Sequence, residues 1–213
     1  MFKFTSSEIR DLLIAFFVIS LCFGIANTGR DIPALLNMLP MIMVGVGLGF
    51  ILHELGHKFV SMKHGYWAEF KLWPQGLLFA LVTSFFGFVF AAPGAVYTYA
   101  NYMTDEINGK ISIAGPVVNI ALALIFLGIA TAVYPSAFTS QNSVIIFIVC
   151  SLGYSINSYL AVFNLLPIGN LDGSKVLRWN AGIWVIVIAI AGVMTFLSMT
   201  MGAENIVRLI IGL

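Results

Sequence analysis

Two histidines and a glutamate lie close together at His53, Glu54 and His57, where a long apolar segment ends. Residues four apart share one face of an α-helix, about 6 Å apart, so both imidazoles can reach one tetrahedral metal ion. Glu54 would lie at the edge of that face, where its carboxylate can take a proton from a metal-bound water. The H-E-x-x-H pattern therefore predicts a zinc site with hydrolytic chemistry.

The alternative is a pair of histidines at a helix end beside a solvated glutamate. That interpretation must place two imidazoles and a carboxylate next to a long uncharged segment, and ionisable groups are expensive to bury in lipid. The third histidine, His64, lies between Lys63 and Gly65. We expect it at an interfacial helix end and not on the metal.

A catalytic zinc ion needs a third protein ligand and an open fourth position. Asp172 follows a long apolar stretch, and Pro167 is expected to end or kink the helix before it. Gly169 and Gly173 allow the chain to turn, so that the carboxylate points back inward. We predict Asp172 as the third ligand; the alternative is an exposed loop carboxylate beside Lys175.

The composition indicates a membrane protein. Hydrophobic residues make up 60% of the 213 residues and charged residues only 9%, against roughly 25% charged in soluble domains. The net charge of +1 gives no indication of nucleic-acid binding. Cys22 and Cys150 both lie in apolar runs, which favours packing roles over a disulfide or a metal pair.

Six uncharged runs have about the length that a membrane-spanning helix needs, roughly 20 residues. They are Leu12–Gly29, Ile32–Leu52, Leu72–Thr104, Ile111–Tyr134, Ser143–Leu171 and Trp179–Ala203. The first run follows Lys3 and Arg10 and could be a signal peptide, but no convincing cleavage site follows it. We therefore expect a retained first span. The second is expected to continue as helix past His57.

The third run, Leu72–Thr104, decides the topology. Its middle is broken by Ala91-Ala92-Pro93-Gly94, which is a poor helix interior. Each half is too short to span as a helix but long enough for a re-entrant or strand-like pass, which membranes tolerate where it lines a cavity.

A re-entrant third run also determines on which side of the membrane each Lys and Arg side chain lies. Eight of them then share one side: Lys3, Arg10, Lys58, Lys63, Lys71, Lys110, Lys175 and Arg178. Only Arg30 and Arg208 remain on the other side. This bias makes the first side cytoplasmic.

The predicted metal ligands require the same topology. His57 and Asp172 both lie near the cytoplasmic ends of their helices only if one full span, Ile111–Tyr134, separates them. We expect an all-α polytopic membrane protein with five spanning helices and a re-entrant or β-like hairpin after the second. Six plain spans are the alternative.

Three motifs follow one another along the chain. They are His53-Glu54-Leu-Gly-His57, Ala114-Gly-Pro-Val-Val-Asn119, and Phe163-Asn164-Leu-Leu-Pro167 with Leu171-Asp172-Gly173. Their order, their spacing and the spans beneath them resemble the site-2 protease family of intramembrane zinc metalloproteases. Many relatives have proline where Gly169 and Asn170 stand, a departure that leaves Asp172 in place.

The resemblance implies three core helices, one zinc ion per chain on His53, His57 and Asp172, and a membrane-associated hairpin that suits residues 69–99. We expect residues 1–213 to form a single transmembrane metalloprotease domain with a catalytic core at about residues 41–175. The active site would face the cytoplasm from within the lipid bilayer. Transmembrane proteins or peptides would be the substrates; the oligomeric state is not indicated.

The expected reaction is peptide hydrolysis by a zinc-activated water, with Glu54 as general base. Asn119 is the candidate donor to the oxyanion, and its alternative is an interhelical hydrogen bond. Asn164 and Asn157 would steady the loop that carries Asp172. The competing function is a zinc-binding protein without protease activity, either a carrier or an inactive regulatory homologue.

Overall fold

The computed structural model describes residues 3–29 and 31–213. Within these residues, five helical segments are long and apolar enough to cross a membrane, which confirms the predicted polytopic fold. They are Ser6–Thr28, Ile32–Lys63, Asp105–Phe138, Gln141–Leu165 and Ala181–Ile211. The prediction that Arg30 lies on the outer side concerns a residue outside the described ranges.

Polar caps begin several of the helices. Thr5 accepts a hydrogen bond from the backbone N–H of Glu8 at the start of α1 (Ser6–Thr28). Thr104 caps α5 (Asp105–Val133) in the same way, and Asn180 caps α8 (Ala181–Ile211). Such side chains satisfy backbone N–H groups that have no partner in the first helical turn. Long apolar stretches behind each cap then continue as helix.

The second spanning segment is irregular just before the histidines. It consists of α2 (Ile32–Val46), a π-helical turn η1 (Gly47–Ile51) and α3 (Leu52–Lys63). The expected continuation of helix through His53 and His57 is correct. The π turn was not predicted.

The third apolar run returns to its starting point. Strand β1 (Trp67–Leu72) pairs antiparallel with β2 (Gly94–Tyr99), and Leu72 lies opposite Gly94. Between the strands the chain forms the short helix α4 (Pro74–Ser84) and an extended return. The predicted hairpin is thus confirmed, and this segment provides no sixth spanning helix.

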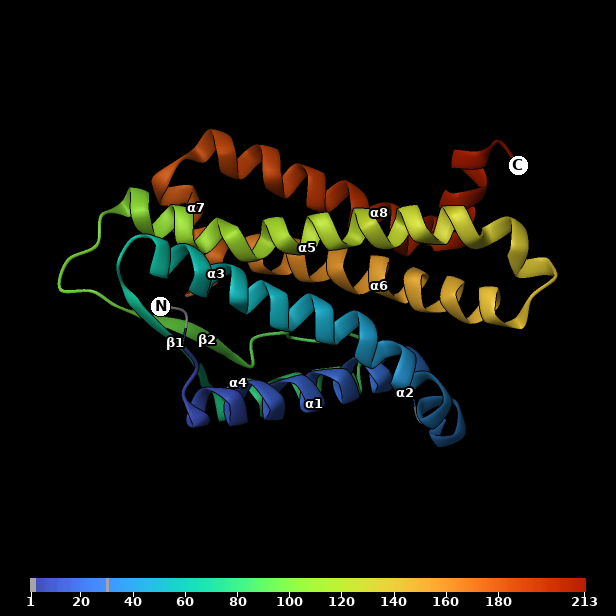
Figure 1. Cartoon of the computed structure of the whole chain (residues 1–213), viewed down its shortest axis with the longest axis horizontal. Helices are drawn as coiled ribbons and strands as arrows, with labels where there is room; N and C mark the ends of the chain where they lie inside the picture. Colours follow the sequence, from blue (N-terminus) through green and yellow to red (C-terminus); the bar gives the residue numbers. More distant parts are fainter. Residues whose placement is uncertain (1–2, 30) are drawn as a thin grey trace.

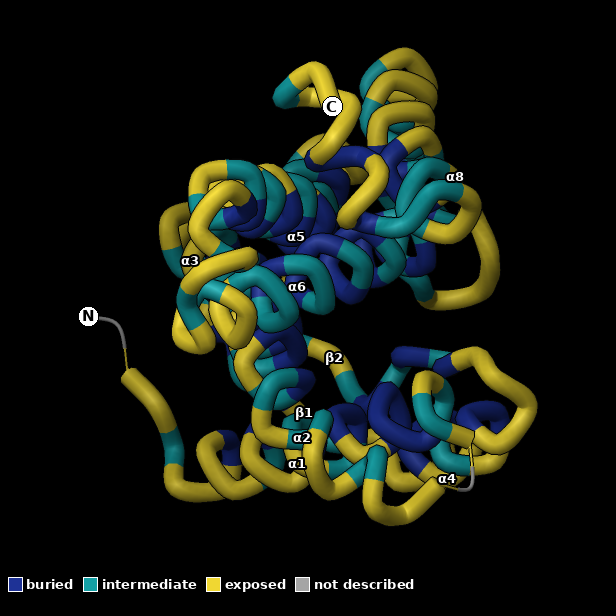
Figure 2. Tube along the Cα trace, turned by 90° about the vertical axis from the view of Figure 1, so that its right-hand side faces the viewer, coloured by how far each residue is buried: buried dark blue, intermediate teal, exposed yellow. Residues whose placement is uncertain are grey.

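The remaining helices form a layer of their own. Helix α5 continues into the short helix η2 (Tyr134–Phe138), and α6 (Gln141–Leu165) runs back beside it to α7 (Asp172–Trp179). Helix α8 packs on α5 and α6 and is interrupted at Gly202. Figure 2 shows α1, α2 and α4 on one side of the strands and α5, α6 and α8 on the other.

The outward side chains suit lipid. Helix α8 presents Phe196 with 65% of its surface exposed, together with exposed Val185, Ile186 and Val193. Many large apolar side chains exposed on one helix are the normal covering of a transmembrane helix.

The amino-terminal helix holds the hairpin in place. The backbone N–H groups of Phe70 and Leu72 donate to the carboxylates of Glu8 and Asp11, at 3.1 and 3.2 Å. Glu8 also pairs with Lys58 of α3, and both side chains are 1% exposed. Helix α1 thereby covers the edge of β1 that faces away from β2.

Candidate metal centre

Helices α3 and α7 bring three candidate ligands together. His53 and His57 lie one turn apart on α3, and Asp172 is the first residue of α7. Helix α6 ends at Leu165, before Pro167, and the chain turns at Gly169 with φ of +55°. Asp172 therefore begins a new helix and does not lie in a loop. Gly173, expected to help the turn, instead lies in α7 against the Leu165 carbonyl.

The ligand atoms form a small triangle. Nε2 of His57 lies 3.0 Å from Nε2 of His53 and 3.1 Å from Oδ2 of Asp172. Nε2 of His53 lies 3.4 Å from the same carboxylate oxygen. Ligands about 2.0–2.1 Å from a tetrahedral zinc ion are roughly 3.3 Å apart, so this triangle fits such an ion.

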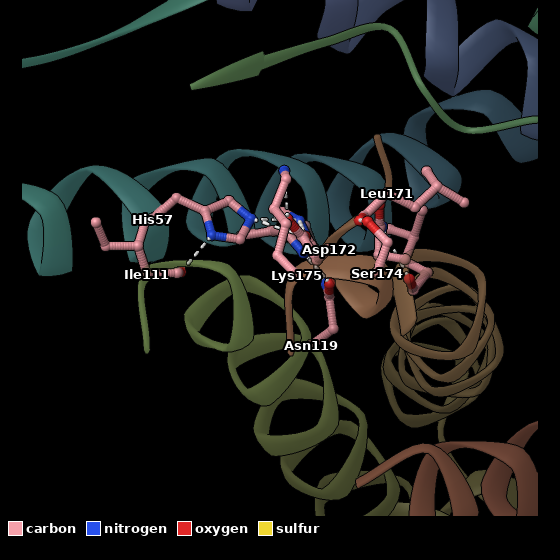
Figure 3. A network of polar contacts seen from close by, with 11 residues as sticks. His57, Ile111, Asn119, Leu171, Asp172, Ser174 and Lys175 are labelled. Carbon is pink, nitrogen blue, oxygen red and sulfur yellow. Dashed lines mark hydrogen bonds and ion pairs between the residues drawn. The ribbon is translucent and has the colours of Figure 1, made fainter. Parts of the chain in front are cut away.

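Hydrogen bonds on the far side of each ring determine where its proton lies. Nδ1 of His57 lies 2.8 Å from the backbone carbonyl of Ile111, which can only accept (Figure 3). Nδ1 of His53 lies 2.5 Å from Oδ1 of Asn119. Both rings therefore donate through Nδ1 and keep a lone pair on Nε2, the arrangement that orients metal-ligating histidines. Two imidazole lone pairs and a carboxylate oxygen then face one another, and only a cation between them would stabilise this arrangement.

The ionised form of Asp172 is favoured by its neighbours. Burial raises the pKa of Asp172, and positive charge on or between the two imidazoles, from a proton or a metal ion, outweighs this effect and holds that pKa well below its ordinary value. Its other oxygen, Oδ1, lies 3.6 Å from Nζ of Lys175, one turn further along α7. A metal-ligating carboxylate must be deprotonated, and Asp172 meets this condition.

Helix α5 passes very close to the two imidazoles at Gly115. A methyl group at this position would lie 2.6 Å from Nε2 of His53, too close for any ordinary contact. Glycine therefore leaves the space in which the three ligand atoms converge.

Glu54 lies beside this triangle and has a free oxygen. Its side chain is buried, and its Oε2 is one of the few buried side-chain oxygens without a hydrogen-bond partner among the described residues. The backbone of Val96, in β2, faces the carboxylate. The arrangement leaves Oε2 able to accept a proton from a water molecule at the metal site.

Asn119 lies in the site but makes different bonds from those of an oxyanion donor. Its Nδ2 donates to the carbonyl of Gly49 and to Oδ1 of Asn157, both at 3.0 Å. These bonds occupy both amide hydrogens and favour the interhelical alternative. Its role as oxyanion donor stays a prediction.

The other polar candidates lie apart from the triangle. Asn164 donates to the Leu160 carbonyl of its own helix, and Asn157 contacts Asn119, although both were expected at the segment carrying Asp172. His64 ends α3 outside the cluster of candidate ligands. The sequence suggested Lys175 only as a neighbour of an exposed Asp172. Its position three residues after Asp172 could have indicated that the two side chains interact on one helix face.

Comparisons with known proteins agree with this chemistry. No protein-family model matches the chain, and no solved structure matches it significantly. "Putative zinc metalloprotease MJ0611" of Methanocaldococcus jannaschii is 40% identical over 87% of this chain and 91% of its own length. YwhC of Bacillus subtilis is 30% identical over 67% of this chain and 70% of its own length. Rip2 of Mycolicibacterium smegmatis is 31% identical over 62% and 54%. Both are described in the same words as the first.

Proposed function

Because the chain belongs to the site-2 protease family of intramembrane zinc metalloproteases, we propose that it hydrolyses peptide bonds in or near transmembrane segments, with one zinc ion held by His53, His57 and Asp172. The observation that carries this proposal is the buried triangle of two Nε2 atoms and one carboxylate oxygen. Both imidazoles are oriented by hydrogen bonds from Nδ1, as a ligand pair requires.

A bound zinc ion would supply a Lewis acid that polarises the scissile carbonyl and acidifies a water molecule. Glu54 takes the proton of the attacking water on Oε2 and passes it to the leaving amine, as a general base and then a general acid. This oxygen is buried and has no hydrogen-bond partner among the described residues that would compete for the proton. Asp172 and the histidines act as ligands and take no proton.

The substrate is an extended segment of a membrane protein, since a helix hides its carbonyl groups in hydrogen bonds. In an antiparallel pair, two directly opposite residues either both point their N–H and C=O groups at each other's strand or both point them away from it. Phe70 N–H points away from β2 to Glu8, so the backbone groups of its partner Val96 point away from β1. The Val96 N–H lies against Glu54, so pairing along the rest of this edge of β2 would hold the substrate beside Glu54.

The site faces the cytoplasm. The helix ends that carry His57 and Asp172 lie at the same end of the molecule as β1 and β2, opposite the carboxyl terminus (Figure 1). Lys58, Lys63, Lys71, Lys110, Lys175 and Arg178 belong to the segments at this end. The positive-inside rule assigns such an end to the cytoplasm.

A cleavage assay on reconstituted protein tests the proposal. Full-length protein in lipid vesicles should cleave a synthetic transmembrane peptide, lose that activity with a zinc chelator, and regain it on addition of zinc. Zinc flux across the vesicle membrane without any peptide cleavage would instead support the carrier. Zinc binding with neither activity would support an inactive homologue.

A further inference from the structure

The π-helical turn η1 lies directly before the ligand-bearing helix, and two asparagines hydrogen-bond to carbonyl groups at this turn, one in η1 and one at the end of α2 just before it. Nδ2 of Asn157, on α6, donates to the carbonyl of Gly45 at 3.3 Å. Nδ2 of Asn119, on α5, donates to the carbonyl of Gly49 at 3.0 Å. A π turn departs from the regular hydrogen-bond ladder, and side-chain donors of this kind can stabilise it.

The amide orientations follow from these carbonyls. Asn157 also donates through Nδ2 to Gly153 at 2.8 Å, and a carbonyl can only accept. Oδ1 of Asn157 must therefore face Asn119, where it accepts from Nδ2 at 3.0 Å. With both hydrogens of Asn119 engaged, its Oδ1 faces Nδ1 of His53. One continuous set of bonds thus links the α6 backbone to a candidate zinc ligand.

The surroundings leave these bonds no alternative partner in water. Asn119 and Asn157 are both 0% exposed. A methyl group at Gly49 would lie 2.7 Å from Oδ1 of Asn157, so η1 packs tightly against this amide. In a site of low dielectric, such networks hold one arrangement firmly, and removing one member leaves the others unsatisfied.

We propose that Asn157 is a positioning residue of the zinc site, which acts through Asn119 to hold His53 with its proton on Nδ1. Nε2 of His53 then keeps its lone pair directed at the metal. The proposal rests on the proposed role of His53 as a ligand. It adds a residue on α6, a helix that carries none of the candidate ligands, and it assigns η1 a role in orienting His53.

Two variants of Asn157 separate this role from simple packing. Asn157→Leu removes every amide bond at similar volume. Asn157→Ser is too short to reach Asn119, but its hydroxyl can bond the Gly153 carbonyl within the helix. The matched control is Ser158→Ala, because Ser158 is equally buried on α6 but bonds only to Tyr154 and Ser155.

The first readout is the tautomer of His53 in zinc-free protein. The chain has three histidines, so nitrogen-15 histidine spectra of the protein in nanodiscs are simple to assign with single His→Gln variants. We expect His53 to be protonated at Nδ1 in the wild type and in Ser158→Ala, and to lose that preference in both Asn157 variants. An unchanged tautomer in both Asn157 variants would overturn the proposal.

The second readout is zinc affinity, measured by competition with a chromogenic chelator. Partners that orient metal ligands typically contribute 10–100-fold, so we expect about tenfold weaker binding in either Asn157 variant. Asn119→Leu and the double variant Asn119→Leu/Asn157→Leu should bind equally, because Asn157 acts through Asn119. Affinity within twofold of the wild type, or additive losses, would reject the relay. A wild type that binds no zinc would reject the proposed function and the zinc site with it, whereas the tautomer experiment separately decides whether Asn157 orients His53 through Asn119.

Discussion

Nε2 of His57 lies 3.1 Å from Oδ2 of Asp172, although the two residues belong to helices α3 and α7, which are far apart in the sequence. Along the chain, helix α5 lies between α3 and α7. The chain crosses the helical layer along α5 and returns along α6. Helix α5 also supplies the Ile111 carbonyl that orients His57 and the gap at Gly115 that admits the ligands. The site therefore depends on three helices, of which only two carry ligands.

Removal of the Glu54 carboxylate should separate binding from catalysis. Glu54→Gln keeps the size of the side chain but cannot accept a proton from water. We expect full zinc occupancy and a loss of cleavage by about 10²–10⁴-fold, the usual contribution of a general base. Metal content and peptide cleavage on the same preparation measure both. Cleavage at the wild-type rate would exclude Glu54 as the base.

A single methyl group on α5 should damage the ligand triangle. Gly115→Ala would place its Cβ against Nε2 of His53 and force the imidazoles apart. We expect at least roughly tenfold weaker zinc binding. Gly128→Ala on the same helix is the control, since nothing lies within 4 Å of the added methyl group. Equal zinc affinities in the two variants would contradict the close approach at Gly115.

The buried pair of Glu8 and Lys58 should stabilise the fold only as a pair. Lys58→Met leaves the Glu8 carboxylate buried beside a neutral side chain, which costs roughly 3–5 kcal/mol. The double variant Glu8→Gln/Lys58→Met should recover most of that loss, because glutamine still accepts from the Phe70 N–H. Denaturant unfolding in mixed micelles gives the free energies.

The exposed pair of Glu106 and Lys110 provides the comparison for that experiment. Lys110→Met removes a surface ion pair on α5, and such pairs contribute little to stability. A small effect of both single lysine variants, or a double variant no more stable than Lys58→Met, would be inconsistent with a coupled buried pair.

Labelling of single cysteines tests the topology. Native Cys22 and Cys150 are buried and can be replaced by alanine first. Cysteines introduced at Lys71 and Lys110 should both react with an impermeant reagent from the cytoplasmic side, because Trp73 N–H and the Pro93 carbonyl close the hairpin at 2.8 Å. A cysteine at Arg208 should react from the other side. Labelling of positions 71 and 110 from opposite sides would rule out the re-entrant hairpin.

Local patterns made some of the site predictable. The spacing of His53 and His57 places them on one helix face whatever the rest of the chain does. Asp172 could be inferred because charge and chain direction put it at the same membrane surface. The hairpin followed from Pro93 and Gly94, which interrupt an otherwise apolar run.

Features that depend on packing between segments could not be predicted. Nothing near Glu8 or Lys58 in the sequence indicates that they pair, because the contact is made by docking α1 on α3 and β1. Gly45 and Gly49 pack closely against Gly153 and Asn157 of α6, and the sequence does not indicate which segment lies against them. Asn157 carries no local signal of its partner Asn119, since only the packing of α6 on α5 brings them together.

X-ray absorption at the zinc edge tests the central claim most directly, on wild-type protein and on Asp172→Ala, with Gly128→Ala as the control. The wild type and Gly128→Ala should contain one zinc ion per chain with nitrogen and oxygen ligands at about 2.0–2.2 Å and outer scattering from two imidazoles. Asp172→Ala should lose most of its zinc. A sulfur shell, a single imidazole, or unchanged zinc content and ligand shell in Asp172→Ala would contradict a metal site built from His53, His57 and Asp172.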